Sequence, residues 1–187
     1  MALQRLTLDG YGQIELNQVA FRRDGRIEAQ CALDATDFAT IPAENGMLLS
    51  VDNVTRTIKL AKNDNFPIAL NYTAEHMYDE RTPGLKNFKL NRGEVLPRLG
   101  YLATGDKFTT NCVCYDDTEF AKGDNASAEA TFVAALEKVG TTALYGGISD
   151  VGAIKISATK PTAGPVLLVL KKTTMPDGQM AVKFQAM

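Results

Sequence analysis

Alternating apolar and polar residues dominate this chain, and they predict a protein made mostly of β-strands. In the segment 26–33, every second residue from Ile27 to Leu33 is apolar, whereas Glu28 and Gln30 fall on the opposite face. The same pattern, or a short apolar run bounded by turn residues, predicts further strands over 12–21, 47–51, 55–60, 66–72, 101–103, 108–115, 152–158, 166–170 and 180–184.

Glycine-containing turns separate several of these strands. Asp24-Gly25 tolerates the positive φ angles of a type I′ turn, so the strands 12–21 and 26–33 are predicted to form a hairpin. The segment 145–149 also contains two glycines. It lacks the spacing of a phosphate-binding loop, so it is interpreted as a turn.

The C-terminal region gives the clearest hairpin. Five consecutive apolar residues, Val166–Leu170, indicate a strand buried on both faces. Turn-forming residues follow at Met175–Gly178, and the alternation then resumes with Val182 and Phe184. A hairpin over 166–185 is therefore predicted.

Two segments depart from the strand pattern. A helix is predicted near residues 126–139, with capping residues before it and Gly140 after it. Its apolar stripe has helical spacing and consists of Phe132, Val133, Leu136 and Val139. The segment 75–98 has no sustained period and is interrupted by Pro83-Gly84, which is typical of a long irregular arm.

These elements predict a mainly β fold, a small barrel or sandwich, with one helix and one long irregular arm. Three segments are proposed: an N-terminal β region over 1–74, an extended arm or connector over 75–98, and a C-terminal β domain over 99–187 that contains the helix. Whether 1–74 folds independently is left open.

Composition and charge exclude several classes of protein. The chain has 187 residues, of which 45% are hydrophobic, and its formal net charge is −2. It is too apolar to be disordered by composition, and it has no apolar stretch near the ~20 residues of a membrane helix. A near-neutral chain does not attract nucleic acid over long range, so neither membrane insertion nor direct nucleic-acid contact is expected. The first ten residues do not resemble a secretory signal.

Candidate chemistry is sparse. Cys31, Cys112 and Cys114 are interpreted as small buried hydrophobic residues in a reducing compartment. A remote alternative is a Cys–His hydrolase in which His76 activates Cys112 or Cys114. The acidic run 116–119 lacks the spacing of a calcium loop, and no cofactor or metal ion is expected.

Two stretches resemble a known class of protein. The segment Gly105–Asn111, which follows Leu99–Leu102, resembles a G-D-x-F-T-T-N pattern, and Thr174–Gln185 resembles a T-M-P-D-G-Q terminal hairpin. Together they resemble the head decoration, or auxiliary capsid, proteins of tailed bacteriophages. The resemblance implies a β-rich, non-enzymatic virion protein that binds the outside of the capsid lattice and stabilises it. It implies the major capsid protein and other copies of the chain, for example in a trimer, as partners, and synthesis in the bacterial cytoplasm.

We expect the arm to supply much of the capsid contact. Its candidate partner-binding residues combine apolar and basic side chains: Arg81, Leu85, Lys86, Phe88, Leu90, Arg92 and Leu96. Deletion of residues 76–92 is expected to abolish capsid binding and to leave the protein folded. The alternative function is a tail-tube or head–tail joining protein, which would assemble as rings or stacked hexamers.

Overall fold

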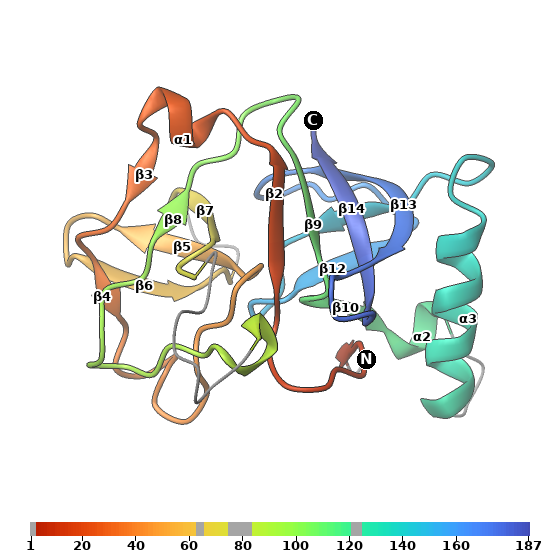
Figure 1. Cartoon of the computed structure of the whole chain (residues 1–187), viewed down its shortest axis with the longest axis horizontal. Helices are drawn as coiled ribbons and strands as arrows, with labels where there is room; N and C mark the ends of the chain where they lie inside the picture. The colour runs from red at the N-terminus through yellow and green to blue at the C-terminus, as the bar shows by residue number, and fades with distance from the viewer. Residues whose placement is uncertain (1–2, 63–65, 75–83, 121–124) are drawn as a thin grey trace.

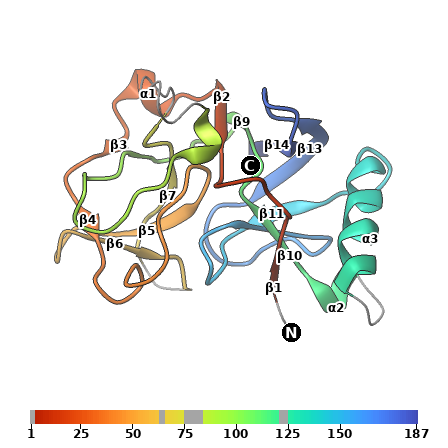
Figure 2. The same ribbon diagram turned by 60° about the horizontal axis from the view of Figure 1, so that its bottom comes forward.

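The molecule consists of two mixed β-sheets that lie side by side along its longest axis (Figure 1). The computed structural model describes residues 3–62, 66–74, 84–120 and 125–187, without the side chains of 125–127. The six-stranded sheet lies on the left in Figure 1 and the eight-stranded sheet on the right. The longest helix stands at the outer end of the eight-stranded sheet in both views (Figure 1 and Figure 2).

The eight-stranded sheet combines strands from both ends of the chain. In spatial order these are β1 (Leu3–Arg5), β10 (Val113–Asp116), β12 (Ile154–Ser157), β11 (Tyr145–Gly147), β13 (Leu167–Thr174), β14 (Met180–Ala186), β9 (Lys107–Thr110) and β2 (Ile14–Gln18). Only β10 and β12 pair in parallel. β1 and β2, which are close in sequence, therefore lie at opposite edges of the sheet.

The six-stranded sheet is built from short strands of the first hundred residues. Its order is β3 (Ile27–Glu28), β8 (Leu99–Gly100), β7 (Ile68–Asn71), β5 (Leu48–Asp52), β6 (Thr57–Leu60) and β4 (Ala32–Leu33). β5 and β6 form a hairpin in which Leu49 is opposite Leu60, and only β4 and β6 pair in parallel. Neither sheet closes into a barrel among the described residues.

Helices are short apart from one. They are α1 (Phe21–Asp24), the 3-10 helix η1 (Leu85–Asn87), α2 (Asp117–Phe120) and α3 (Asn125–Glu137). α3 buries Phe132 against the eight-stranded sheet, where its ring stacks on Tyr115 with the centroids 4.6 Å apart. Phe120 contacts the Phe132 ring edge-on, with the ring centroids 5.3 Å apart. This aromatic cluster fastens both α2 and α3 to the sheet.

The two faces of β10 contact two different hydrophobic cores. Val113 and Tyr115 face the larger core, which is lined mainly by the eight-stranded sheet and includes Leu48 and Leu70 of the six-stranded sheet. Cys112, just before the strand, and Cys114 face the smaller core. Alternation along an extended chain explains this division, because successive side chains point to opposite faces. All four residues of the stretch 112–115 are no more than 2% exposed.

The mainly β fold, the helix and the C-terminal hairpin are confirmed. α3 begins one residue before the predicted 126–139 and ends two residues early. β13 and β14 pair across the predicted turn, from Leu167 opposite Ala186 to Thr174 opposite Met180. The two-sided burial expected for 166–170 is wrong in part, because Leu168 and Leu170 remain half-buried.

The hairpin predicted at Asp24-Gly25 is wrong. Residues 21–24 form α1, and Gly25 ends this helix in the left-handed conformation, with φ of 69°. The same dipeptide that suits a hairpin turn also suits a helix end, because both need a residue with positive φ. The flanking strands β2 and β3 instead pair with β9 and β8, in different sheets.

Four further local predictions need correction. The strand predicted over 26–33 is two strands of two residues, β3 and β4, at opposite edges of the six-stranded sheet, and Ile27, predicted on the apolar face, is 38% exposed. The strand predicted over 108–115 is two strands, because the chain turns at Asn111 to leave β9 and enter β10. The strand predicted over 101–103 ends at Gly100. The segment 145–149 is not a turn: its first three residues form β11, where Gly146 lets Phe184 pack against the backbone at a position where a Cβ would collide with it.

The two sheets do not follow the three predicted segments. β1 and β2 of the 1–74 region belong to the sheet built mainly by 99–187, and β8 of the C-terminal segment belongs to the other sheet. The boundaries proposed at residues 74 and 98 therefore do not coincide with the boundary between the sheets.

Candidate partner-binding surface

The described part of the arm, residues 84–98, runs along the six-stranded sheet. After η1, Leu90 exchanges two backbone hydrogen bonds of 2.9 Å with Ala43. The chain then turns at Asn91, whose backbone N–H and side-chain amide donate to the carboxylate of Glu94 at 2.9 and 2.8 Å. The Leu90–Ala43 bonds attach the arm to the segment before β5, and the Asn91–Glu94 bonds stabilise the turn within the arm. The first part of the predicted arm, 75–83, lies outside the described residues.

Several predicted site residues hold the arm to the protein itself. Leu90 is 1% exposed, and Phe88 packs, half-buried, against the same core. Leu85 is also half-buried in η1. Lys86 forms an ion pair with Asp9, and its carbonyl oxygen accepts a 2.7 Å hydrogen bond from Tyr11 N–H. Deletion of 76–92 would remove a buried leucine and these two attachments, so we now expect it to destabilise the fold, in contrast to the outcome expected from the sequence.

The outward-facing residues of the arm include Arg92, Val95 and Leu96, and Ile41 lines the same groove as Arg92. Val95 is 62% exposed, Leu96 49% and Ile41 39%, and the Arg92 side chain is also exposed. Ile41 and Arg92 line a groove of about 310 Å³ between the arm and the segment 35–41. We call Ile41, Arg92, Val95 and Leu96 the arm surface.

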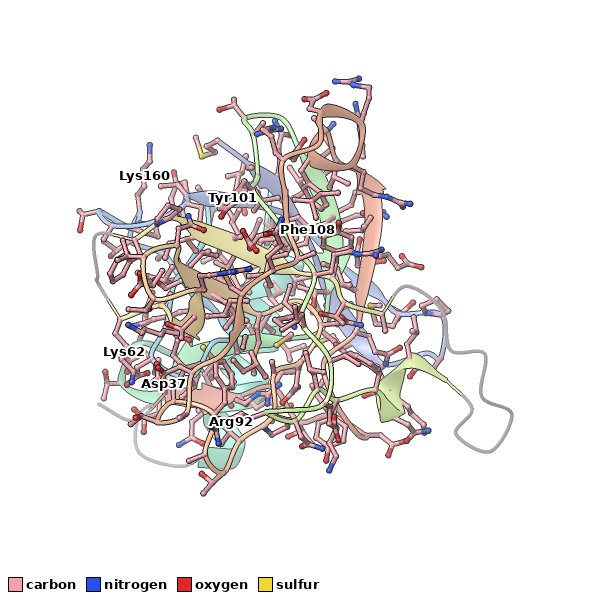
Figure 3. The ribbon with its side chains drawn as sticks, turned by 90° about the vertical axis from the view of Figure 1, so that its left-hand side faces the viewer. Asp37, Lys62, Arg92, Tyr101, Phe108 and Lys160 are labelled. Carbon is pink, nitrogen blue, oxygen red and sulfur yellow. The ribbon has the colours of Figure 1, made fainter. Side chains whose placement is uncertain are left out.

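Figure 3 views the molecule from the end that carries the arm surface. Arg92 lies in the lower part of this view, as does the Asp37–Lys62 ion pair, whose atoms are 2.5 Å apart. Exposed apolar side chains here have charged groups of both signs nearby. Such a mixture is typical of the rim and centre of a protein–protein contact.

Of the predicted site residues, Arg92 and Leu96 are thus exposed, whereas Leu85, Lys86, Phe88 and Leu90 attach the arm. Arg81 lies outside the described residues. Ile41 and Val95 were not predicted, although both are large apolar residues in segments without a strand or helix period. That combination is the one signal by which the sequence could have indicated them.

A buried polar network positions the segment that carries Ile41. Glu44, 4% exposed, receives two hydrogen bonds from the Arg5 guanidinium at 2.6 and 2.8 Å and a third from Gly12 N–H at 2.6 Å. The hydrogen bond to Glu44 raises the pKa of Arg5 above its ordinary value, despite the opposing effect of burial. The Asn71 side-chain amide donates to the Glu44 carbonyl at 2.9 Å. The network therefore joins β1 of one sheet to the entrance of β5 in the other.

The thiols lie in the cores. Cys31, Cys112 and Cys114 are free and at most 2% exposed. Burial raises the pKa of Cys114 to about 11 and is the main reason that the pKa of Cys31 also rises to about 11. A nucleophilic cysteine has a lowered pKa and access to solvent. His76, the base considered for Cys112 or Cys114, lies outside the described residues.

The acidic run at 116–119 has structural contacts. Asp116 accepts hydrogen bonds from the Thr118 side chain at 2.7 Å and backbone at 3.0 Å. Glu119 accepts from the Ser157 hydroxyl at 3.0 Å and from Ala158 N–H at 2.7 Å. Within the described ranges, no group of three or more acidic, cysteine or histidine side chains is placed to hold a metal ion.

The two stretches that resemble decoration proteins lie next to one another. β9, from the first stretch, pairs with β14, from the second, and the rings of Phe108 and Phe184 are 5.5 Å apart. Asp177 of the terminal turn accepts a 2.8 Å hydrogen bond from the Gln13 side chain. These residues build the eight-stranded sheet and lie away from the arm surface.

The chain matches no family model, no curated protein and no solved structure. None of the helices in the described part of the chain has the length and apolar character needed to cross a membrane.

Proposed function

We propose that this protein is a structural component of a tailed-phage virion that binds the outside of the capsid lattice and stabilises it. The six-stranded half of the molecule, through the arm surface, contacts the major capsid protein. The eight-stranded half serves as its scaffold. The protein is made in the bacterial cytoplasm and acts in the assembled particle.

The observation that carries this proposal is the uneven distribution of exposed apolar side chains. Among the described residues, seven large hydrophobic side chains are exposed, and six of them belong to segments of the six-stranded half: Ile27, Ile41, Val54, Phe66, Val95 and Leu96. The seventh is Met187, after β14. This concentration of exposed apolar residues in one half makes that half the candidate region for protein association.

The sequence resemblance supports the same class of partner. It rests on residues 99–111 and 174–185, within which β9 and β14 are neighbouring strands of the eight-stranded sheet, whereas β8 belongs to the six-stranded sheet. A capsid lattice presents many identical sites, so each contact needs only modest affinity when several copies are linked. A small surface with a few apolar anchors and one exposed arginine fits that requirement.

Sedimentation with empty phage heads tests the proposal. The wild-type protein should co-sediment with the heads at a fixed number of copies per capsomer. Leu96→Asp and Val95→Asp should each reduce the bound fraction at least tenfold, because a carboxylate would be buried against the lattice. Met187→Asp is the matched control, since it places the same charge on an exposed apolar position of the other half.

Two results would count against the proposal. Absence of wild-type binding, together with assembly into rings or tubes, would favour a tail-tube or head–tail joining protein. Equal loss of binding in Met187→Asp and Leu96→Asp would mean that the arm surface is not the contact. Circular dichroism of each variant separates loss of binding from loss of folding.

A further inference from the structure

A short stretch between β1 and β2, residues 9–13, touches three parts of the molecule that are far apart in the sequence. We call it the strap. In Figure 1 it is the red chain that leads up into β2, beside the yellow-green turn of η1. Its neighbours are the terminal turn (residues 175–179, between β13 and β14), the arm and the entrance of β5. The strap therefore lies between the terminal turn and the arm.

The terminal turn holds the strap through two side chains. Gln179 pairs with the backbone of Asp9 in both directions: its side-chain oxygen accepts from Asp9 N–H at 2.8 Å, and its amide group donates to the Asp9 carbonyl oxygen at 3.1 Å. Asp177 accepts hydrogen bonds from the Gln13 side chain at 2.8 Å and from the Gln179 side chain at 2.6 Å. The two side chains of the turn thus support each other and fix both ends of the strap.

The strap in turn holds the beginning of the arm. Asp9 forms an ion pair with Lys86, and Tyr11 N–H donates to the Lys86 carbonyl oxygen at 2.7 Å. Gly10 has a φ of 91°, and a Cβ at this position would collide with the same carbonyl oxygen. Lys89 Nζ lies 5.3 Å from the centroid of the Tyr11 ring, within reach of a cation–π contact. The close approach of the strap to η1 therefore requires a glycine.

The strap also reaches the second attachment of the arm. Gly12 N–H donates to the Glu44 carboxylate at 2.6 Å. Glu44 follows Ala43, which exchanges the two backbone hydrogen bonds with Leu90. Both attachments of the arm, at Lys86 and at Leu90, therefore adjoin a segment that the terminal turn holds.

Charge supports the same arrangement. The hydrogen bond with Asp9 is the main reason that the pKa of Lys86 is raised, and the Asp177 carboxylate adds to this effect. Burial opposes ionisation of Asp177, but hydrogen bonds from Gln13 and Gln179 outweigh it and lower the pKa of this carboxyl group. At neutral pH Asp177 is therefore ionised, so that it attracts Lys86 and accepts from Gln13 at the same time.

We propose that Asp177 and Gln179 are positioning residues for the arm surface. They are not part of that surface: they fix the strap, and the strap fixes the arm at Lys86 and beside Leu90. An arm that is held in place before binding loses less conformational freedom on binding, so the affinity for a partner depends on the terminal turn. The effect on binding rests on the proposed function, whereas the positioning itself is a property of the free protein.

Amide hydrogen exchange of the free protein tests the positioning. Gln179→Ala should accelerate exchange at the N–H groups of Tyr11 and Leu90 by about fivefold, which corresponds to the usual net contribution of one hydrogen bond. Exchange at Phe132, in α3, should keep its wild-type rate, because this helix packs on the other side of the eight-stranded half. Local acceleration of this kind separates positioning from a general loss of stability.

Three further variants sharpen the test. Gln185→Ala is the matched control, because it removes the same side chain from a later position of β14, where the strand pairs with β13 and β9, and it should leave exchange at Leu90 unchanged. Asp177→Ala should accelerate exchange at Leu90 as Gln179→Ala does. Asp177→Asn should be closer to wild type, because its side-chain oxygen still accepts from Gln13.

Two outcomes of the exchange experiment would overturn the proposal. An unchanged rate at Leu90 in Gln179→Ala would mean that the arm is independent of the strap. Equal acceleration at Leu90 and Phe132 would mean that the variant destabilises the whole fold.

Co-sedimentation with empty phage heads tests the consequence for binding. Gln179→Ala should bind the heads about threefold more weakly than wild type, because its arm must be ordered on binding, and Gln185→Ala should bind like wild type. Equal binding of all three proteins would refute an effect of the terminal turn on affinity. Absence of wild-type binding would count against the proposed function alone, and exchange at Leu90 would then still decide whether the turn positions the arm.

Discussion

The two halves of the molecule conceal their apolar side chains to different degrees. The larger core contains seven buried aromatic rings, Phe21, Tyr72, Phe108, Tyr115, Phe120, Phe132 and Phe184, and the last five belong to elements of the eight-stranded half. The core of the six-stranded half has one fully buried aromatic residue, Phe38, and borrows Cys112 and Cys114 as part of its floor. The six-stranded half also carries six of the seven exposed large hydrophobic side chains among the described residues, five of them in connecting segments and Ile27 in β3.

This difference assigns most of the stability to the eight-stranded half and the proposed partner binding to the six-stranded half. A half with a large core tolerates an exposed, functional surface elsewhere in the same chain, because the folded state does not depend on that surface. The six-stranded half is stabilised by packing against β10 and by the Arg5–Glu44 ion pair. Substitutions in the two halves should therefore affect different measurements.

The largest effect is expected in the aromatic cluster of the eight-stranded half. Phe132→Ala should lower the free energy of unfolding by about 3–5 kcal/mol, because it leaves a cavity between Tyr115 and Phe120. Urea denaturation measures this loss. Glu137→Gln, on the exposed side of the same helix, is the control and should cost less than about 1 kcal/mol. A cost below about 1 kcal/mol for Phe132→Ala would contradict the role of this half as the scaffold.

Two leucines of the arm should contribute very different amounts to the free energy of unfolding. Leu90→Ala should cost about 2–5 kcal/mol of unfolding free energy, because Leu90 is 1% exposed in the smaller core. Leu96→Ala should change it by less than about 0.5 kcal/mol, since 49% of Leu96 is exposed. Urea denaturation of both variants gives the comparison. Similar costs for the two would mean that the arm surface is part of the folded core.

Breaking the Arg5–Glu44 ion pair, which joins the two halves, should lower the free energy of unfolding by a smaller amount. Glu44→Gln should cost about 2 kcal/mol, at the low end for a broken buried pair because the Arg5 side chain is 35% exposed. A double-mutant cycle with Arg5→Met measures the coupling between the two side chains. Additive losses would show that the network does not join the sheets energetically.

The smallest effect concerns acid. Hydrogen bonds from Thr55, and to a lesser extent from Lys59 and Val54 N–H, lower the pKa of Asp52 from 3.8 to about 2. Because the pKa of Asp52 is lowered in the folded state, its carboxylate stabilises the fold at pH values above the ordinary pKa of 3.8. This stabilisation is lost as the pH falls from about 3.8 through about 2. Amide exchange at Val54 should therefore accelerate over that range. In Asp52→Asn, exchange should be faster at neutral pH and should lose this titration, and a retained titration would exclude Asp52 as its origin.

Elements whose contacts are local could be predicted from the sequence. The β13–β14 hairpin and α3 each contain the residues that define them: a turn between two strands, or a stripe with its caps. The pairings of β2 and β3 could not be predicted, because alternation shows which face is buried but not which distant strand lies alongside. Asp24-Gly25 illustrates the consequence, since a local turn signal was compatible with two structures.

The candidate site shows the same limit at the level of side chains. The loss of period at 75–98 predicts an irregular arm, and its described part, 84–98, contains only the short helix η1 and an isolated bridge at Leu90. This loss of period could not distinguish Leu90, which is buried, from Leu96, which is exposed, because an irregular segment has no repeating face. Ile41 and Val54 lie in turns of the six-stranded half, and only the folded chain shows that they face solvent.

The pairing of the first strands has a consequence for synthesis on the ribosome. β1 and β2 have their only sheet partners, β10 and β9, about a hundred residues further along the chain. At a translation rate of about 5–20 residues per second, the nascent N-terminal strands wait about 5–20 seconds before those partners emerge. During that interval Leu6 and Ile14, which end up in the larger core, remain uncovered. The order of emergence therefore leaves these N-terminal strands unpaired, and accessible to a ribosome-associated chaperone, until β9 and β10 have been synthesised.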